Sequence, residues 1–210
     1  MTSAVRLILA STSPARLATL RAAGIEPIAL APGVDEEAAV AAAGPLAPRD
    51  MVMLLARLKA EAVAAAHPDV DGLILGGDSA FELDGIVYGK PHAPEVARER
   101  WRAQRGRSGL LHSGHWLIDA RAGGAGKTFG AAAVARVRFA SDITDAEIDA
   151  YIATGEPLEV AGAFTIDSRG AAYIESIEGD PSTVIGLSIP ILRTLTRSLA
   201  IEWHDLWNRS

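Results

Sequence analysis

Polar residues that could bind phosphate follow the short apolar run at residues 7–10. Ser11, Ser13 and Arg16 occupy the segment between an expected strand and an expected helix that begins at Pro14. The free N–H groups and the positive dipole end of such a helix attract anions, and the two hydroxyls add donors. A cation in the first turn opposes the helix dipole unless an anion lies nearby. The segment therefore predicts a phosphate site, with an ordinary Ser-Pro cap and a solvated arginine as the alternative.

Carboxylates and a lysine come next along the chain. Asp35, Glu36 and Glu37 are consecutive after a Pro-Gly turn. An acidic loop at this place could hold Mg²⁺ or accept hydrogen bonds from a ribose, or it could simply be solvated. Lys59 lies one position off the apolar stripe of an expected helix at 48–66, so we expect its stem to be half buried. Its ammonium group either extends to water or points into a cleft.

Two further charged residues follow glycines. Asp78 comes after Gly-Gly at the expected end of a buried strand at 73–75. Ligands of open α/β sheets collect at the carboxyl ends of strands, so Asp78 could hold a metal or act as a general base, or it could be a plain turn residue. Lys90 closes an expected hairpin, and Pro91 restrains its backbone to an extended conformation that gives the side chain a defined direction. A surface lysine after a turn is the alternative.

The elements that must position these residues alternate between strands and helices. Strands are expected at 5–10, 27–31, 73–75, 80–83, 86–88, 110–120, 129–139 and 171–177, with a Gly-rich turn at 121–127. Helices are expected from Pro14 to Gly24, at 48–66 and 94–104, from a Thr144/Glu147 capping box to Gly155, and at 181–199 with an interruption around 186–190. Because the Asp84-Gly85 hairpin occurs among strand–helix units, the pattern predicts an α/β fold with a mixed sheet, forming one domain over 1–210.

Composition narrows the classes of function. A net charge of −6 over 210 residues argues against a protein that coats nucleic acid, so phosphate-binding cations must be concentrated locally. The absence of cysteine excludes disulfides, thiolate metal sites and a cysteine nucleophile. No apolar stretch of about 18 residues is present to span a membrane, and the N-terminal apolar run is too short for a signal peptide. We therefore expect a cytoplasmic protein that does not bind membranes.

Seven phrases occur in one order along nearly the whole chain: LILASTSPARL (7–17), APGVDEE (31–37), LARLKAEAV (55–63), GGDSAFELDG (76–85), YGKP (88–91), ATGEPLEVAGAF (153–164) and GAAYIESIEGDPSTVIGLSIP (170–190). Together they resemble the Maf family of nucleotide pyrophosphatases. The resemblance implies a central twisted mixed sheet with two α/β lobes around a nucleotide cleft, as in inosine triphosphatases. It also implies hydrolysis of a nucleoside triphosphate to the monophosphate and pyrophosphate with a divalent cation, Mg²⁺ or Mn²⁺, and a homodimer.

Family roles carry over to individual positions of this chain. The resemblance assigns phosphate binding to Ser11 and Arg16, and it places Glu36, Lys59 and Lys90 in the cleft. Asp78 takes the position of the proton acceptor, and the metal would be held by Glu36 and Asp78. In this hypothesis Arg16 and the two lysines neutralise the charge on the leaving pyrophosphate while Asp78 orients the attacking water.

The chain also departs from the family pattern. Ala15 replaces the first of two adjacent arginines that many members carry. Ser79 and Asp167 stand at positions linked with base choice in the family and differ from the branch that prefers dTTP and UTP, so that preference is not transferred. The substrate could be an ordinary, non-standard or modified triphosphate, and the role could be nucleotide house-cleaning or control of cell division. A nucleotidyltransferase and a non-catalytic nucleotide-binding regulator remain the competing hypotheses, and the products formed from a triphosphate would separate them.

Overall fold

The protein is described by a computed structural model that covers residues 5–124 and 126–209. Ala125, which falls in the predicted turn at 121–127, and both ends of the predicted 1–210 domain lie outside the described residues. The chain divides into two units. Unit 1 holds the described residues up to Asp78, Ser113–Ala133 and the described residues from Gly186 onward, and unit 2 holds Ser79–His112 and Val134–Ile185.

Parallel and antiparallel strands both occur in the structure. The strands are β1 (Leu7–Ala10), β2 (Ile28–Leu30), β3 (Leu73–Leu83), β4 (Ile86–Tyr88), β5 (Ser108–Asp119), β6 (Thr128–Phe139) and β7 (Ile174–Glu178). Hydrogen-bonded neighbours follow the order β2-β1-β3-β5-β6-β7, with β4 also paired to β3. The β1–β2 and β1–β3 pairs are parallel, whereas β3–β4 and β6–β7 are antiparallel. The predicted α/β class with a mixed sheet is therefore confirmed.

The helices begin largely where the sequence predicts them. They are α1 (Pro14–Ala22), α2 (Glu36–Ala43), α3 (Pro48–Ala66), α4 (Pro94–Gln104), α5 (Asp145–Ala153), α6 (Pro181–Ile185) and α7 (Ile189–Arg197), with 3₁₀ turns η1 (Glu156–Glu159), η2 (Ala161–Ala163), η3 (Arg169–Tyr173) and η4 (Trp203–Leu206). Proline occupies the first turn of α1, α3 and α4, where its missing N–H costs no hydrogen bond. No helix among the described residues is long and apolar enough to cross a membrane.

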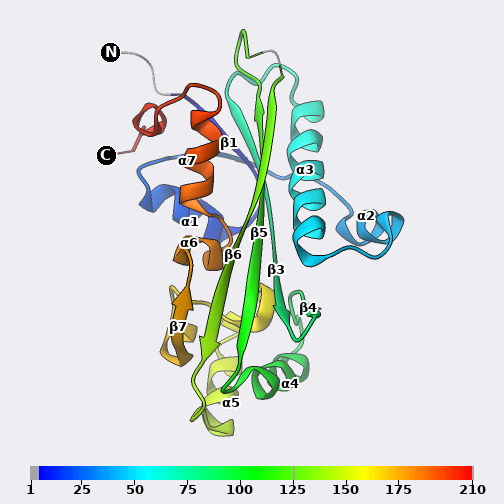
Figure 1. Cartoon of the computed structure of the whole chain (residues 1–210), viewed down its shortest axis with the longest axis vertical. Coiled ribbons are helices and arrows are strands. Elements are labelled where there is room, and N and C mark those ends of the chain that lie inside the picture. Colours follow the sequence, from blue (N-terminus) through cyan, green and yellow to red (C-terminus); the bar gives the residue numbers. More distant parts are fainter. Residues whose placement is uncertain (1–4, 125, 210) are drawn as a thin grey trace. The chain divides into compact units, whose positions relative to one another are not determined.

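Unit 1 is built around the buried strands β1 and β3. Alternate side chains along each strand point to opposite faces, and both faces are covered by helices (Figure 1). One face packs against α1 and α7 through Leu7, Leu9, Leu73, Leu75, Leu20, Leu192 and Leu195. The other packs against α3 through Ile8, Ala10, Ile74, Ala60 and Val63. Burial on both faces explains why these strands are continuous apolar runs.

One strand prediction is wrong in a way that matters for the site. The glycines at 76 and 77 do not end a strand, because β3 continues unbroken from Leu73 to Leu83. A Cβ atom at Gly76 would lie 2.0 Å from the carbonyl oxygen of Ala56 and 2.9 Å from the Cβ atom of Ala60. Gly76 therefore marks a close approach of α3 to the strand, and Asp78 stands within β3 and not in a turn after it.

Two other local predictions need correction. The acidic residues 35–37 do not form a loop, since Asp35 caps α2 through a hydrogen bond from the Ala38 N–H at 3.0 Å and both glutamates lie in its first turn. Carboxylates at that end of a helix are stabilised by its dipole, a signal that predicts a helix start. The strand expected at 171–177 begins only at Ile174, because η3 precedes it.

Unit 2 has an aromatic core next to α4 and α5. Trp101 stacks edge to face with Phe139 and Tyr151 at centroid distances of 5.6 and 5.3 Å. Its indole N–H donates to the carbonyl of Ala163 at 2.8 Å, so the buried polar atom is paired. The predicted capping box of α5 is confirmed, because Thr144 and Glu147 exchange hydrogen bonds in both directions.

Candidate active site

The β1–α1 junction brings three predicted residues together. Ser13 is the N-cap of α1 and accepts a hydrogen bond from the backbone N–H of Arg16. Ser11 Oγ accepts from the Ser13 N–H and from Arg16 Nη1, each at 3.1 Å. The junction therefore holds a helix N-terminus, two hydroxyls and a guanidinium group within hydrogen-bonding distance of one another.

Arg16 is a buried cation, with 8% of its surface exposed. Its Nε donates to the carbonyl of Gly186 at 2.9 Å. Burial lowers the pKa of Arg16, and this effect is opposed by the negative charges of Asp78 and Glu36. A guanidinium group stays protonated even when it is buried. Arg16 therefore acts as a fixed positive charge beside those carboxylates.

Lys59 joins two carboxylates from different elements. Its Nζ lies 2.7 Å from Asp78 Oδ1 on β3 and 2.8 Å from Glu36 Oε1 on α2. The lysine side chain is only 7% exposed, as against 49% for the side chain of Glu36. Of the two alternatives left open by the helical pattern, the structure therefore has the ammonium pointing inward and not extending to water.

Asp78 is a buried carboxylate whose proton affinity is increased. Burial raises its pKa, while Lys59 and Arg16 act in the opposite direction without cancelling the effect. A carboxylate with a raised pKa is a better proton acceptor at neutral pH than an exposed aspartate. The same carboxylate is held in place by the short ion pair with Lys59, so both its position and its basicity suit acid–base chemistry.

Glu36 and Asp78 are the carboxylates that could take part in holding a divalent cation. No group of three or more histidine, cysteine or acidic side chains suited to a metal occurs among the described residues. Mg²⁺ is commonly bound by one or two carboxylates, with phosphate oxygens and water completing its shell. Glu36 and Asp78, which both contact Lys59, fit that arrangement. The phosphate oxygens of a substrate would supply further ligands.

The remaining predicted residues belong to unit 2. Lys90 is exposed, and its Nζ lies 3.9 Å from Glu159 Oε2. The backbone before it is fixed, because the Gly89 carbonyl accepts from Arg100 Nη1 at 2.5 Å and from the Gly162 N–H at 3.3 Å. Ser79 directly follows Asp78 on β3, and Asp167 is exposed between η2 and η3. Of the predicted set, unit 1 thus holds Ser11, Ser13, Arg16, Glu36, Lys59 and Asp78.

Sequence reasoning missed one partner in this cluster. The carbonyl of Gly186 orients Arg16. Every residue has a backbone carbonyl, so the residue type at position 186 does not reveal this acceptor. The available signal was the predicted break in the last helical region around 186–190, because carbonyl groups at the end of a helix accept hydrogen bonds from outside the helix. The structure has this break between α6 and α7.

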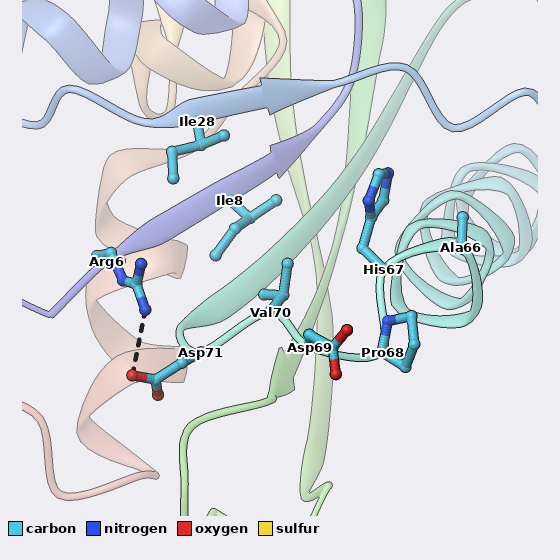
Figure 2. Close-up of a pocket in the computed structure, with 9 residues that line it drawn as sticks. All are labelled: Arg6, Ile8, Ile28, Ala66, His67, Pro68, Asp69, Val70 and Asp71. Atoms are coloured by element: carbon cyan, nitrogen blue, oxygen red, sulfur yellow. Dashed lines mark hydrogen bonds and ion pairs between the residues drawn. The ribbon is translucent and has the colours of Figure 1, made fainter.

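A cavity of about 340 Å³ lies elsewhere in unit 1, at the amino ends of β1 and β3 (Figure 2). It is lined by Arg6, Ile8, Ile28, Ala66, His67, Pro68, Asp69, Val70 and Asp71. Its charged side holds the exposed ion pair between Arg6 and Asp71 at 3.2 Å. None of the predicted site residues lines this cavity, and ligands of parallel sheets bind at the opposite, carboxyl ends of strands.

Comparison with known proteins identifies the family. Residues 6–199 match the family model described as Maf-like protein. The chain belongs to this family. A Maf-like relative from Leifsonia xyli subsp. xyli (strain CTCB07), named nucleoside triphosphate pyrophosphatase, is 68% identical over 212 residues, which cover 98% of both chains. One of the same name from Salinispora tropica is 49% identical and covers 98% of this chain and 88% of its own.

The family resemblance seen in the seven sequence phrases is confirmed by this match. Among solved structures, the Staphylococcus aureus Ham1 protein aligns with the Maf-like chain at a TM-score of 0.42 and 17% identity. That alignment covers 65% of this chain and 72% of the Ham1 chain.

Proposed function

We propose that this Maf-like protein hydrolyses nucleoside triphosphates between the α- and β-phosphates, giving the monophosphate and pyrophosphate. The observation that carries the proposal is the cluster in which Lys59 contacts both Asp78 and Glu36 beside the buried Arg16. The names of the relatives, at up to 68% identity over nearly the full chain, support the same activity.

Cations and hydroxyls of the cluster bind the phosphates in this proposal. The hydroxyls of Ser11 and Ser13 donate to phosphate oxygens, and the positive dipole end of α1 attracts the phosphate charge. Arg16 and Lys59 are already desolvated, so their attraction to a triphosphate is stronger than it would be in bulk water. Lys90 adds an exposed positive charge for the leaving pyrophosphate.

Asp78 receives the proton in the chemical step. A water oxygen attacks the α-phosphorus and loses one proton to the Asp78 carboxylate, while the bond from the α-phosphorus to the bridging oxygen breaks. The bond electrons leave with pyrophosphate, whose growing charge is stabilised by Arg16, Lys59 and Lys90. No covalent intermediate is needed, because positioning and electrostatic stabilisation account for this type of transfer.

Glu36 and Asp78 would hold a divalent cation, Mg²⁺ or Mn²⁺, together with the phosphates. Such a cation, when bound, polarises the phosphoryl oxygens and neutralises charge. Ser79 and Asp167 contact the sugar or the base in this proposal, and both the ordinary and the modified triphosphates are candidate substrates. The proposal further includes one functional domain, a location in the cytoplasm and a homodimer, the last of which light scattering would test.

The decisive experiment follows products with isotopic water. Wild-type protein is incubated with a panel of ordinary and modified triphosphates in H₂¹⁸O, with and without a sugar phosphate, and with Mg²⁺, with Mn²⁺ and with a chelator. We expect the monophosphate and pyrophosphate, with ¹⁸O in the monophosphate because the α-phosphorus is attacked. Label in pyrophosphate, transfer to a sugar phosphate, or saturable binding without turnover would each overturn the proposal, the last two in favour of a nucleotidyltransferase and a regulator.

Substitution of Asp78 tests the proton acceptor. Asp78→Asn should bind triphosphate yet turn over roughly 10²- to 10⁴-fold more slowly, the usual contribution of a general base. Asp119→Asn is the matched control, because Asp119 is a buried aspartate of unit 1 paired with its own arginine, Arg121. The control should keep near wild-type turnover. Near wild-type turnover by Asp78→Asn would refute the assignment of Asp78.

A further inference from the structure

Glu156 organises a cluster of hydrogen bonds in unit 2 that no predicted role explains. The residue begins η1 directly after α5, and its side chain is 13% exposed. Its Oε1 accepts from Tyr151 Oη at 2.9 Å, Thr165 Oγ1 at 2.6 Å and the Gly170 N–H at 3.1 Å. Its Oε2 accepts from Ser168 Oγ at 2.8 Å and the Arg169 N–H at 3.3 Å. Five donors therefore converge on one carboxylate.

The cluster requires a carboxylate and not merely a polar side chain. Every partner points a donor at Glu156, and only an ionised carboxylate offers acceptors on both oxygens. Burial raises the pKa of Glu156, but the hydrogen bonds from Thr165, Gly170, Ser168 and Tyr151 together lower the pKa to about 2. The group is thus ionised at neutral pH. A glutamine at position 156 would place its amide N–H against the backbone N–H of Arg169 or Gly170, neither of which can rotate to become an acceptor.

Four of the five bonds hold a short exposed segment, residues 167–169, in place. Thr165 lies before the segment and Gly170 follows it, and the other two donors, Ser168 and Arg169, belong to the segment itself. On its other side the carboxylate contacts Tyr151, whose ring packs against the core residue Trp101 at a centroid distance of 5.3 Å. Glu156 therefore ties the exposed segment to the core of unit 2.

Close packing reinforces the connection. A Cβ atom at Gly170 would lie 2.6 Å from both the Tyr151 hydroxyl oxygen and the Thr165 carbonyl oxygen. Any larger residue at position 170 would push the segment away from the Glu156 carboxylate. The conformation of the exposed segment 167–169 is thus determined by one partly buried carboxylate and one glycine.

We infer that Glu156 is a positioning residue that holds the segment 167–169 in the conformation that recognises the nucleoside part of the substrate. This inference rests on the proposed function, in which Asp167 contacts the substrate. A recognition segment that is already fixed before binding loses less conformational entropy when the substrate binds. It also discriminates better between bases, because it cannot move to accommodate a base whose polar groups lie in other places. The five bonds of Glu156 all come from residues of unit 2, whereas the proposed proton acceptor Asp78 belongs to unit 1, so Glu156 acts on affinity and base choice and not on bond cleavage.

The test compares Glu156→Gln with Glu147→Gln. Both changes remove a carboxylate that accepts local hydrogen bonds around α5, but Glu147 caps the helix and does not contact 165–170. With each variant at a temperature where it is folded, KM and kcat are measured for a panel of triphosphates. For Glu156→Gln we expect KM to rise roughly ten- to a hundredfold, kcat to stay within a few fold, and the ranking of bases to flatten. Glu147→Gln should keep the wild-type ranking.

Two further variants keep the inference testable if Glu156→Gln is too unstable. Gly170→Ala moves the same segment while leaving the carboxylate intact, and it should raise KM and flatten the base ranking in the same way. Glu156→Asp retains the charge and should restore part of the ranking. Wild-type protein without pyrophosphate release would overturn the proposed function. An active wild type with an unchanged KM and base ranking in Glu156→Gln or Gly170→Ala would overturn this inference alone.

Discussion

Replacement of Lys59 by methionine is the most informative perturbation of the candidate site. Methionine keeps most of the buried stem but removes the charge that contacts Asp78 and Glu36. Removing one partner of a buried ion pair typically costs about 3–5 kcal/mol, because the other charge is left uncompensated. Glu36 is half exposed and can be solvated, so Asp78 carries most of this cost.

Protonation of Asp78 limits that cost and makes it depend on pH. Burial already raises the Asp78 pKa, and the loss of Lys59 removes the main effect that lowers it. A carboxyl group whose pKa is higher in the folded than in the unfolded state stabilises the fold at low pH and loses this contribution as pH rises through the folded pKa. We therefore expect Lys59→Met to be close to wild type near pH 4 and least stable, by about 3 kcal/mol, above neutral pH.

Urea unfolding of a double-mutant cycle measures this effect. Wild type, Lys59→Met, Asp78→Asn and the double variant are unfolded at about pH 5 and pH 8, with m-values compared to check that the transition stays two-state. The double variant should be more stable at pH 8 than the sum of the single effects implies, since neither position 59 nor position 78 then carries an uncompensated buried charge. Equal destabilisation of Lys59→Met at both pH values, or additive effects in the cycle, would refute the reasoning.

Two other perturbations concern stability. Because the pKa of Glu156 falls from an ordinary 4.5 to about 2, its ionised form contributes up to about 3 kcal/mol above pH 4.5 that is lost as pH falls toward 2. Acid titration of unfolding should show this loss in wild type and not in Glu156→Gln, and parallel curves would contradict it. Gly76→Ala should destabilise the protein by roughly 1–3 kcal/mol, since its Cβ would overlap the Ala56 carbonyl. An unchanged melting temperature would show that α3 moves aside freely. Gly89→Ala is the matched control, because Gly89, like Gly76, has no positive φ and its Cβ would meet nothing within 4 Å.

Much of the fold can be predicted because its signals are local. The bounds of α3 and α4 agree with the sequence prediction to the residue, since proline marks each start and apolar periodicity carries each helix to its end. The start of α2 was missed, although Asp35 is a standard cap, because three acidic residues also fit a solvated loop. The continuity of β3 was missed because the residues that require its glycines are distant in sequence: Gly76 faces Ala56 on α3, and Gly77 faces Arg16 on α1.

The candidate site shows the same division between local and long-range information. The types and family positions of Arg16, Lys59 and Asp78 were readable in the sequence. The direction of the Lys59 side chain could not be predicted, because the helical pattern allows it to point either to water or inward. Its inward direction is set by the carboxylate of Asp78 on β3. Glu156 was overlooked for a related reason, since its partners at 165–170 are assembled by the fold and share no sequence spacing with it.

The two glycines of β3 have a consequence for how the site could change. Successive strand residues face opposite sides, so Gly76 lets the backbone of α3 approach on one side while Gly77 lets Arg16 approach on the other, where a Cβ atom would lie 3.3 Å from its Nε. The strand thus has no side chains on either face directly before Asp78, the residue that pairs with Lys59. Substitutions at Gly76 or Gly77 would change the distances between Asp78, Lys59 and Arg16. Catalytic rates could therefore vary in this protein without a change in any ionisable residue.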